Sequence, residues 1–232
     1  MAMQGLSVKK LLNFPAVLFI TATDTHVGKT IAAFVLGTLL KAQGHDVGVM
    51  KPVQCGGNDA AFLRKALELD DDSALINPCY VPEPLSPHLA FRRAGKKVDL
   101  AKIRRSFEIL RARHEILLIE GAGGLLVPLK NNYYNADLIR DLNAEVIIVA
   151  RLGLGTINHT LLTVQTAKGK GLKIKGIIFS DTEGGRKSIA QQTNPAEIAK
   201  LAAVKVLGII PHLKPLTQGN ILAKCKKLKF NV

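Results

Sequence analysis

The amino-acid sequence predicts an α/β protein with a mostly parallel central sheet covered by helices on both faces. Short apolar runs recur along the chain, and most are followed by a stretch whose apolar residues have helical spacing. The runs are continuous rather than alternating, which is typical of strands buried on both faces. Alternation of strands and helices favours parallel pairing through right-handed crossovers. No internal repeat or linker is present, so we expect one domain over residues 1–232, with an N-terminal extension at 1–15 and a basic tail at 214–232.

The first half of the chain contributes three strands and two helices. A strand at 17–21 reads VLFIT, and a helix at 30–43 follows it and ends before a glycine. The inward face of this helix comprises Ile31, Phe34, Val35, Thr38 and Leu39. A second strand, VGVM, occupies 47–50. A helix at 99–113 carries apolar residues at helical spacing and leads into a third strand, ILLI.

The second half continues the same alternation. The third strand at 116–119 is followed by a fourth, VIIVA, at 146–150, and a helix is expected over 156–168. Two further β-branched runs predict strands at 174–179 and 206–210, with a helix near 195–203 between them. Ligands of such sheets gather at the carboxyl ends of the strands, so the residues just after each strand are the candidates for function.

Composition and charge narrow the class of function. Apolar residues make up 47% of the chain and charged residues 22%, which is ordinary for a soluble globular protein. Lys and Arg number 32 against 18 acidic residues, so the formal net charge of +14 favours anionic ligands. The basic residues are dispersed and no nucleic-acid recognition motif accompanies them, so we predict no nucleic-acid partner.

Cysteines and hydropathy argue against a secreted or membrane protein. The three cysteines form no Cys-x-x-Cys pair, which disfavours a disulfide framework or a zinc site. No apolar run approaches the length that spans a bilayer, and the first residues lack the apolar region of a signal peptide. We therefore expect a cytoplasmic protein with no membrane partner.

A phosphate-binding loop follows the first predicted strand. The segment ATDTHVGKT at 22–30 nearly fits G-x-x-x-x-G-K-[ST], with Ala22 in place of the first glycine. Its backbone N–H groups and the start of the next helix would cradle phosphate oxygens. Lys29 would reach the β- and γ-phosphates, and the Thr30 hydroxyl would bind Mg²⁺. The strand before and the helix after the motif favour this P-loop NTPase interpretation over a chance Gly-Lys-Thr.

Polar residues at other strand ends add candidates. Glu120 ends a buried strand, where an acid is costly unless it meets a cation, so it is either a Mg²⁺ ligand or a solvent-facing acid. Lys51 follows the second strand and is either catalytic or a surface lysine. Asp59 opens a helical stretch and is equally well explained as a metal ligand or a helix cap. Cys55 has no His or Asp partner in its motif, which favours a pocket residue over a nucleophile.

Eight stretches, in order and over nearly the whole chain, resemble the dethiobiotin synthetases. They are ATDTHVGKT at 22–30, KPVQCGG at 51–57, NDA at 58–60, EPLSPHLA at 83–90, EGAGGLLVPL at 120–129, GLGTINHTLLT at 153–163, GIIFSD at 176–181 and GIIPHL at 208–213. A phosphate loop alone would be weak evidence, but its combination with the other motifs is specific. The resemblance implies an enzyme that joins CO₂ to 7,8-diaminononanoate as a carbamate. ATP then phosphorylates the carbamate, and the second amine closes the ureido ring of dethiobiotin.

The resemblance also implies a role for individual residues. The nucleotide is expected at His26, Val27, Gly28, Lys29, Thr30 and Ile31, at Glu120, Gly121, Ala122 and Gly123, and at Ser180, Asp181, Pro211, His212 and Leu213. Mg²⁺ is expected at Thr30, Asp59 and Glu120, and the catalytic lysines are Lys51 and Lys29. The substrate is expected at Thr25 and Cys55, and at Gly155, Thr156 and Asn158 across a homodimer interface. A helix N-terminus, as at this last segment, suits a carboxylate.

Four residues depart from the family pattern. Ala22 replaces a glycine, and His26 stands where glutamate is common. Cys55 stands where a serine or threonine is usual, so one hydroxyl contact to the substrate is either lost or replaced by a thiol. Ser180 stands where an asparagine that reads the base is expected, so the preference for ATP over other nucleoside triphosphates is open.

Three other classes of protein remain alternatives. A related amidoligase would need a glutaminase domain, for which the chain has no room. An ATPase that positions macromolecules would carry K-G-G-x-G-K-T in its loop, whereas Thr23-Asp24 occupies that stretch here, and its hydrolysis would respond to DNA. An iron–sulfur scaffold would need paired cysteines and would be brown with iron.

Overall fold

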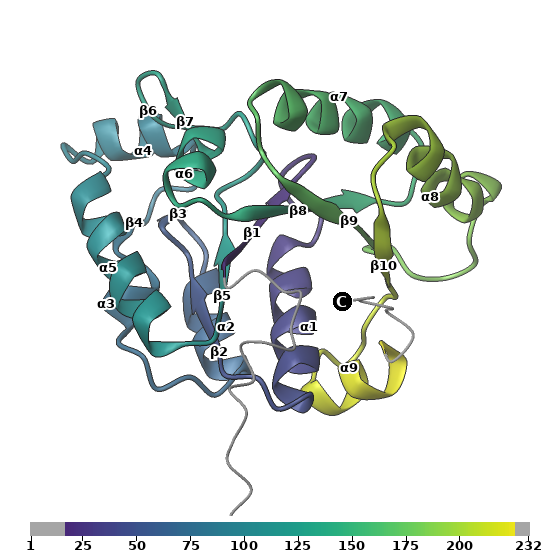
Figure 1. The fold of residues 1–232 in the computed structure, drawn as a ribbon, viewed down its shortest axis with the longest axis horizontal. Helices are drawn as coiled ribbons and strands as arrows, with labels where there is room; N and C mark the ends of the chain where they lie inside the picture. Colours follow the sequence, from purple (N-terminus) through teal and green to yellow (C-terminus); the bar gives the residue numbers. More distant parts are fainter. Residues whose placement is uncertain (1–16, 226–232) are drawn as a thin grey trace, which may run out of the picture.

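The computed structural model describes residues 17–225 and has a six-stranded parallel sheet at its centre, in the order β10-β9-β8-β1-β5-β2 (Figure 1). Its strands are β1 (Val17–Ala22), β2 (Val47–Met50), β5 (Ile116–Glu120), β8 (Glu145–Arg151), β9 (Ile174–Ser180) and β10 (Val206–Ile210). All neighbouring strands pair in parallel, so the predicted fold class and all six predicted strands are confirmed. The expected extension at 1–15 and the tail residues 226–232 lie outside the described residues.

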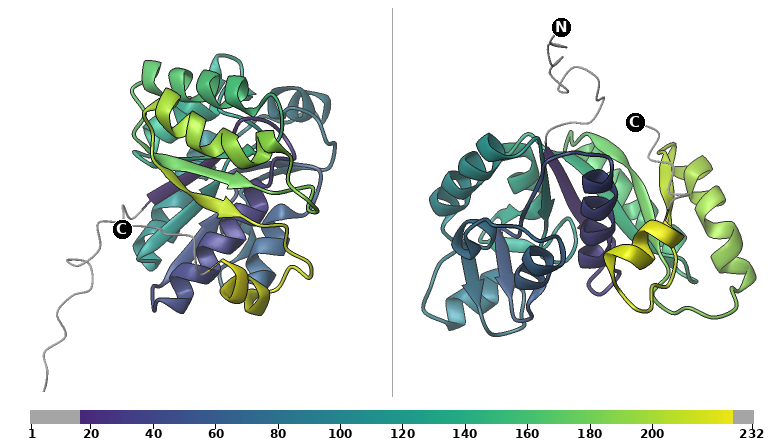
Figure 2. Two further views of the ribbon diagram at one scale, coloured as in Figure 1. Left: turned by 90° about the vertical axis from the view of Figure 1, so that its right-hand side faces the viewer. Right: turned by 90° about the horizontal axis from the view of Figure 1, so that it is seen from below.

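Helices cover both faces of the sheet (Figure 2). One face is covered by α1 (Lys29–Ala42), α2 (Asp59–Ala66) and α9 (Gln218–Lys224). The other is covered by α5 (Leu100–Arg113), α6 (Asn135–Asp141), α7 (Thr156–Gly169) and α8 (Ile189–Ala202). Successive residues of β1 point to opposite layers: Phe19 packs with the α5 to α8 layer and Leu18 with the α1 layer, and both are fully buried. This two-sided burial explains why the strands have continuous apolar sequences.

The structure adds short elements that the sequence analysis does not predict. Two small sheets pair β3 (Val53–Cys55) with β4 (Cys79–Val81), and β6 (Pro128–Lys130) with β7 (Tyr133–Tyr134). The short helices α3 (Ser73–Ile76) and α4 (Pro87–Arg93) precede α5. Elements of two to seven residues hold too few apolar positions to establish a period, so they escape detection by spacing.

The eighth helix begins earlier than predicted. The sequence analysis places its start near Pro195, whereas α8 starts at Ile189 and contains the proline. Ser188 is the N-cap, and its side chain and that of Gln191 form a capping box. A proline within a helix removes one backbone hydrogen bond and crowds the carbonyl four residues earlier, and α8 accommodates this cost because its capping box begins the helix at Ile189.

The C-terminal segment contains a packed helix. Within the stretch expected as a basic tail, α9 buries Ile221 against the α1 layer, and Gln218 Nε2 donates to the Ala66 carbonyl at 2.8 Å. No helix within residues 17–225 is long and apolar enough to cross a membrane.

The strand order explains where polar residues gather. Because β1, β5 and β2 are neighbours and parallel, their carboxyl ends meet at one edge of the sheet. The phosphate loop follows β1, Glu120 ends β5 and Lys51 follows β2. Segments nearly a hundred residues apart in sequence are therefore brought side by side.

Candidate active site at the carboxyl edge of the sheet

The phosphate loop connects β1 to α1 with the geometry that its sequence predicts. Gly28 is the N-cap of α1 and has φ +97°, a left-handed conformation that favours glycine. Ala22 is the last residue of β1 and is buried, without a positive φ, so no glycine is needed there. Lys29 is buried, and its Nζ donates to the Asp24 carbonyl at 3.1 Å. The Lys29 side chain thus points back into the phosphate loop and contacts its backbone.

Four predicted residues converge beside this loop. Lys51 Nζ lies 2.5 Å from Glu120 Oε1 and 2.9 Å from Asp59 Oδ2. The Thr30 hydroxyl donates to the same Glu120 oxygen at 3.0 Å. Lys51 is 3% exposed and Glu120 is 1% exposed, so this ion pair is shielded from water. Glu120 therefore faces a cation, and the solvent-facing alternative for this acid is excluded.

The two buried lysines differ in their electrostatics. Burial alone would lower the pKa of Lys51, but the carboxylates of Glu120 and Asp59 outweigh it and raise that pKa above the ordinary value. Burial and, after it, the charge of Lys51 lower the pKa of Lys29 to about 8, against the raising effect of nearby acids. Burial also raises the pKa of the Cys55 thiol to about 11, so the thiol stays protonated at neutral pH, in accord with a pocket residue.

The cluster offers suitable ligands for Mg²⁺. Glu120 Oε2 is buried and has no hydrogen-bond partner among the described residues, so this carboxylate oxygen is available to a cation. The Thr30 hydroxyl donates to the other oxygen of the Glu120 carboxylate, and the Asp59 carboxylate accepts from the Lys51 ammonium, which also contacts Glu120. No three His, Cys, Asp or Glu side chains within residues 17–225 form a metal cluster. The oxygen atoms of Glu120, Asp59 and Thr30 fit Mg²⁺, because this ion binds through one or two carboxylates plus phosphate oxygens and water.

The segments expected at the base and ribose lie at the other side of the phosphate loop. A Cβ atom on Gly28 would come within 2.5 Å of Ser180 Oγ, so Ser180 packs directly against the loop. Asp181 pairs with Lys187 and accepts a hydrogen bond from the Gly184 N–H at 3.0 Å. The backbone of His212 also donates to Asp181, which ties the segment 211–213 to the end of β9. Asp181 is thus held in contacts that order these loops.

The segment expected at the substrate tail is at the surface. Gly155 is the N-cap of α7 with φ +87°, Thr156 is fully buried and Asn158 is exposed. No hydrogen bond or ion pair among the described residues joins these three to the Lys51 cluster. The nearest link is an ion pair between Arg151, at the end of β8, and Asp24 of the phosphate loop, at 2.9 Å.

Four polar residues that the sequence analysis does not single out hold the site in place. Gln54 Oε1 accepts a hydrogen bond from the Ala60 N–H at 3.0 Å and so fixes the start of α2 beside Asp59. Asn77 Nδ2 donates to the Lys51 carbonyl at 2.6 Å. Asn135 and Asn194 donate to backbone carbonyls of the loops after β5 and β8. Because their partners are backbone atoms, no side-chain motif reveals them.

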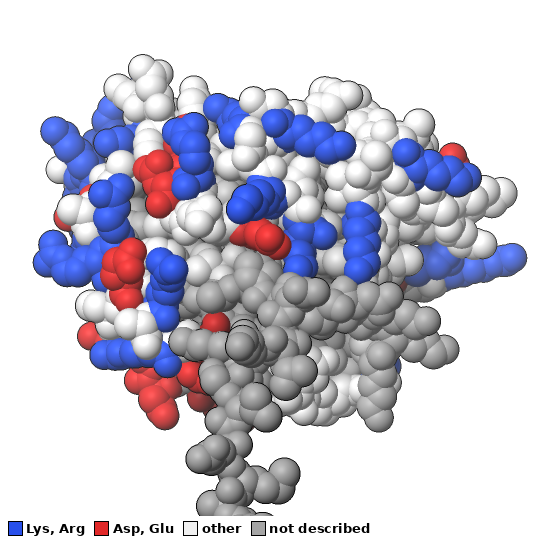
Figure 3. Space-filling model, in the orientation of Figure 1, with Lys and Arg blue, Asp and Glu red and all other residues white. Residues whose placement is uncertain are grey.

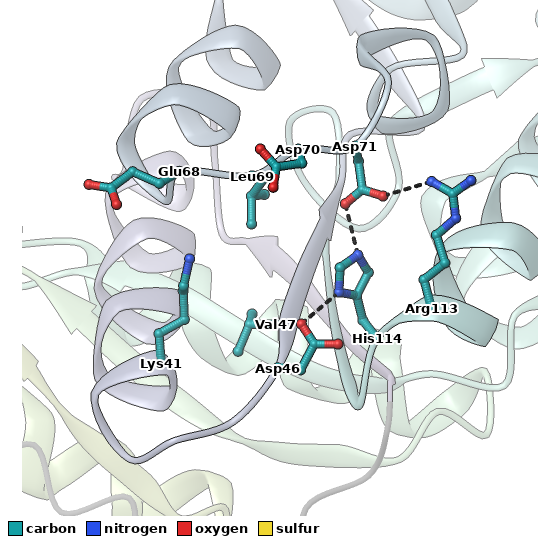
Figure 4. A pocket seen from close by; sticks show the side chains of 9 residues that line it. All are labelled: Lys41, Asp46, Val47, Glu68, Leu69, Asp70, Asp71, Arg113 and His114. Atoms are coloured by element: carbon teal, nitrogen blue, oxygen red, sulfur yellow. Dashed lines mark hydrogen bonds and ion pairs between the residues drawn. The ribbon is translucent and has the colours of Figure 1, made fainter.

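A hollow of about 250 Å³ lies away from this site, where β2 and β5 begin and α1 and α5 end (Figure 4). His114 lies between two carboxylates there, with Nδ1 3.0 Å from Asp46 and Nε2 2.8 Å from Asp71 (Figure 4). Arg113 also pairs with Asp71 at 3.1 Å. These contacts link α5 to the loops beside β2, and none of the predicted site residues lines the hollow.

Basic side chains are spread over the face of the molecule seen in Figure 3 rather than gathered in one patch. On the face shown in Figure 3, Lys and Arg occur across the visible area with acidic side chains among several of them. This distribution agrees with the dispersal seen in the sequence.

Comparisons with known proteins agree with the motifs. A family model described as an AAA domain matches residues 16–220. The ATP-dependent dethiobiotin synthetase BioD of Methanococcus vannielii is 39% identical over 198 residues, covering 85% of this chain and 94% of that protein. That of Thermodesulfovibrio yellowstonii is 40% identical over 219 residues, covering 88% and 91%.

Solved structures resemble the chain in fold alone. The septum site-determining protein MinD of Pyrococcus horikoshii, complexed with Mg-ADP, is 18% identical with a TM-score of 0.58, covering 89% of this chain and 85% of that one. A ParA family ATPase of Chlorobium tepidum is 15% identical with a TM-score of 0.55, covering 91% and 93%. The fold is therefore that of a P-loop NTPase. The sequence relatives, which match nearly the whole chain, identify the family: the chain belongs to the dethiobiotin synthetases.

Proposed function

We propose that this protein is a cytoplasmic ligase that converts 7,8-diaminononanoate and CO₂ to dethiobiotin, with ATP and Mg²⁺, in biotin biosynthesis. The observation that carries the proposal is the cluster of the buried Lys51 and Glu120 with Asp59 and Thr30 beside the phosphate loop. The relatives at about 40% identity, named ATP-dependent dethiobiotin synthetases, supply the reaction.

The reaction needs three bond-forming steps. One amine of the diamine attacks CO₂, forms a C–N bond and loses a proton, which gives a carbamate. A carbamate oxygen then takes the γ-phosphoryl group of ATP, forming a carbamic–phosphoric anhydride and ADP. The second amine attacks the carbonyl carbon of this anhydride. The C–O bond to phosphate breaks, phosphate leaves, and the amine loses a proton to solvent as the ureido ring closes.

The two lysines would stabilise negative charge in these steps. Because the pKa of Lys51 is raised, it remains an ammonium at neutral pH and cannot act as a general base. Its place in the cleft suits the charge on the transferring phosphoryl group or on the carbamate. Lys29, within the phosphate loop, suits the β- and γ-phosphates. Phosphoryl transfer depends mainly on positioning and charge stabilisation, so no protein nucleophile is required.

The other predicted site residues would bind Mg²⁺, the diamine and the nucleotide base. Mg²⁺, held by Thr30, Asp59 and Glu120, would neutralise charge on the phosphoryl group. Cys55 has a protonated thiol and would contact the diamine as a neutral side chain, with Thr25 nearby. Ser180 packs on Gly28 and has a shorter side chain than asparagine, so the base would be held loosely and CTP or GTP would compete with ATP.

We propose further that the site is completed by a homodimer. The N-terminus of α7 reaches the surface at Gly155, whereas Thr156 is buried, and the backbone N–H groups of the first turn would bind the carboxylate tail of the diamine. Asn158 is exposed on the same turn.

The test is phosphate release by the purified protein with ATP, Mg²⁺ and bicarbonate, with and without 7,8-diaminononanoate. Release that depends on the diamine, with dethiobiotin detected by mass spectrometry, is the expected result. No diamine dependence with ATP, CTP or GTP would contradict the proposal, and hydrolysis stimulated by DNA would then favour the positioning ATPase.

A variant of Lys51 tests the mechanism. Lys51→Ala should keep the fold yet reduce turnover by about 10² to 10³, the usual effect of losing a charge aimed at a transition state. Lys65→Ala, which removes an exposed lysine of α2, is the matched control and should turn over normally. Near-normal turnover of Lys51→Ala would remove this lysine from the mechanism.

A further inference from the structure

A buried asparagine fastens the glycine-rich loop that follows Glu120. Asn135, the first residue of α6, is 1% exposed. Its Nδ2 donates to the Ala122 carbonyl at 2.7 Å and to the Gly124 carbonyl at 2.8 Å. A primary amide has two donor hydrogens, and both are spent on the carbonyls that flank Gly123. The side chain thus draws two carbonyl oxygens of one loop to a single point.

This fastening determines which backbone groups of the loop face the cleft. With two carbonyls turned towards Asn135, the chain reverses at Gly123, where φ is +64°. The N–H groups of Ala122, Gly123 and Gly124 have no acceptor within residues 17–225. The three residues are half-buried, so these N–H groups are partly shielded from water. Successive N–H groups around a left-handed residue form a concavity that binds anions.

The loop lies directly against the phosphate loop. A Cβ atom on Gly124 would be 3.1 Å from the Ala22 carbonyl, and one on Gly123 would be 3.7 Å from Thr25 Oγ1. The anion-binding concavity therefore lies within reach of the same reactants as the phosphate loop. Glu120 immediately precedes it, so a shift of this loop would also move a proposed Mg²⁺ ligand.

We propose that Asn135 is a positioning residue for the reaction: it holds residues 122–124 with their carbonyls turned away and their N–H groups facing the oxyanions of the reactants. Those oxyanions belong either to the nucleotide phosphates or to the carbamate of the substrate. This inference rests on the proposed ligase function. Asn135 touches no reactant itself and acts through the loop that it holds.

The experiment compares three variants in the full-length protein. Asn135→Ala removes both donors, and Asn135→Asp keeps the shape but replaces the donors by acceptors. Leu110→Ala, in the buried face of α5, is the control for a loss of thermal stability without a change in this loop. For each, kcat and KM are measured for the diamine-dependent release of phosphate. The Kd of a non-hydrolysable ATP analogue with Mg²⁺ is measured by calorimetry.

The expected result is a loss of about tenfold or more in kcat for both Asn135 variants. Leu110→Ala should lower the Tm of the enzyme and leave its kcat unchanged. An accompanying tenfold rise in the Kd of the analogue assigns the concavity to phosphate oxygens; an unchanged Kd assigns it to the carbamate. If the wild type turns over and both Asn135 variants keep kcat and Kd within twofold, the inference is wrong. If the wild type shows no diamine-dependent turnover, the proposed function fails. In that case no carbamate is formed, so a Kd of the ATP analogue that is the same in the Asn135 variants as in the wild type also overturns the role of Asn135.

Discussion

Lys29 and Lys51 carry the same side chain within one cleft, yet their surroundings shift their pKa values in opposite directions. Lys51 gains two carboxylate partners, Glu120 and Asp59, whereas the Lys29 ammonium donates to a backbone carbonyl. Burial without a full counter-charge leaves Lys29 with a pKa of about 8. A bound phosphate would supply the counter-charge that Lys29 lacks, whereas Lys51 already has counter-charges from Glu120 and Asp59.

A pH dependence of nucleotide binding follows from Lys29. Phosphate contact favours the ammonium and so raises its pKa, which means that binding above pH 8 takes up a proton. We expect an uptake close to zero at pH 7 and of about 0.9 proton at pH 9, with affinity falling by up to about tenfold per pH unit above 8. Calorimetry with the ATP analogue in buffers of different ionisation enthalpy measures the uptake.

Lys29→Arg provides the control for this prediction. A guanidinium stays protonated throughout the range, so the variant should show no proton uptake at pH 9. An uptake at pH 9 that is as large in Lys29→Arg as in the wild type would assign the effect to another group.

Residues that follow strands could be predicted, and residues that support them could not. Lys51 and Glu120 were accessible from sequence because a polar residue at the end of an apolar run is unusual, and parallel strands bring such ends together. Asn135 and Asn194 lie at or within helices, where asparagine is unremarkable. Their significance depends on which distant backbone carbonyls they meet, and only the folded chain determines that.

At the scale of elements, α1 and α7 begin in the same way. Each has an N-cap glycine in the left-handed region, Gly28 with φ +97° and Gly155 with φ +87°. Both helix starts were predicted to within one residue because Gly-Lys-Thr and Gly-Thr follow apolar strands. The sequence predicts the start of α8 wrongly because Pro195 favours a helix N-terminus, whereas the capping box of Ser188 and Gln191 begins the helix at Ile189.

One residue of α8 fixes the loop that leads to α7. Asn194 is buried and donates through Nδ2 to the Leu152 carbonyl at 2.9 Å and to the Gly153 carbonyl at 3.2 Å. This loop ends at Gly155, so Asn194 sets the direction in which the N–H groups of the first turn of α7 point. Those N–H groups are the proposed site for the carboxylate tail of the diamine.

Truncation of this residue should therefore weaken substrate binding selectively. Asn194→Ala leaves the Leu152 carbonyl without this donor, at about 1–3 kcal/mol, and leaves the Gly153 carbonyl with the Thr156 N–H as its donor, so the loop relaxes. We expect the KM for the diamine to rise about tenfold or more, while the Kd of the ATP analogue changes less than twofold. Gln192→Ala, which removes an exposed side chain of the same helix, is the control. A diamine KM within twofold of the wild type would disprove this role for Asn194.

At the scale of the whole molecule, the order of the strands in the sheet brings the site residues together, and the sequence predicts this strand order only in part. Strand alternation established the layers, but the adjacency of β1, β5 and β2 comes from long-range pairing that no local pattern encodes. The same applies to the small sheets and to His114, which bridges Asp46 and Asp71 at the opposite edge. Local spacing predicts elements; contacts between distant segments decide how they meet.

The outer surface of α7 carries apolar residues that suit a dimer. Leu154, just before the helix, is 91% exposed and Leu162 is 54% exposed. Asn158 and Leu162 are four residues apart and lie on one side of α7, and Leu154 is in the loop just before the N-cap; these three residues are called the α7 stripe. A partner that covers this stripe would exclude water from the leucines and also close the proposed carboxylate site.

A charge placed in this stripe tests whether the protein is a dimer through α7 and whether the partner subunit completes the proposed carboxylate site. Leu162→Glu should give a monomer in sedimentation velocity, because an apolar contact is replaced by a charge that would be buried unpaired. Since the proposed carboxylate site is completed across the interface, the diamine KM should rise by at least about tenfold. The nucleotide Kd should stay unchanged, because the phosphate loop is contained within one subunit. Leu201→Glu, at a residue that is 62% exposed on α8, is the matched control and should keep the dimer. A Leu162→Glu protein that stays dimeric with a normal diamine KM would show that the α7 face is not the interface.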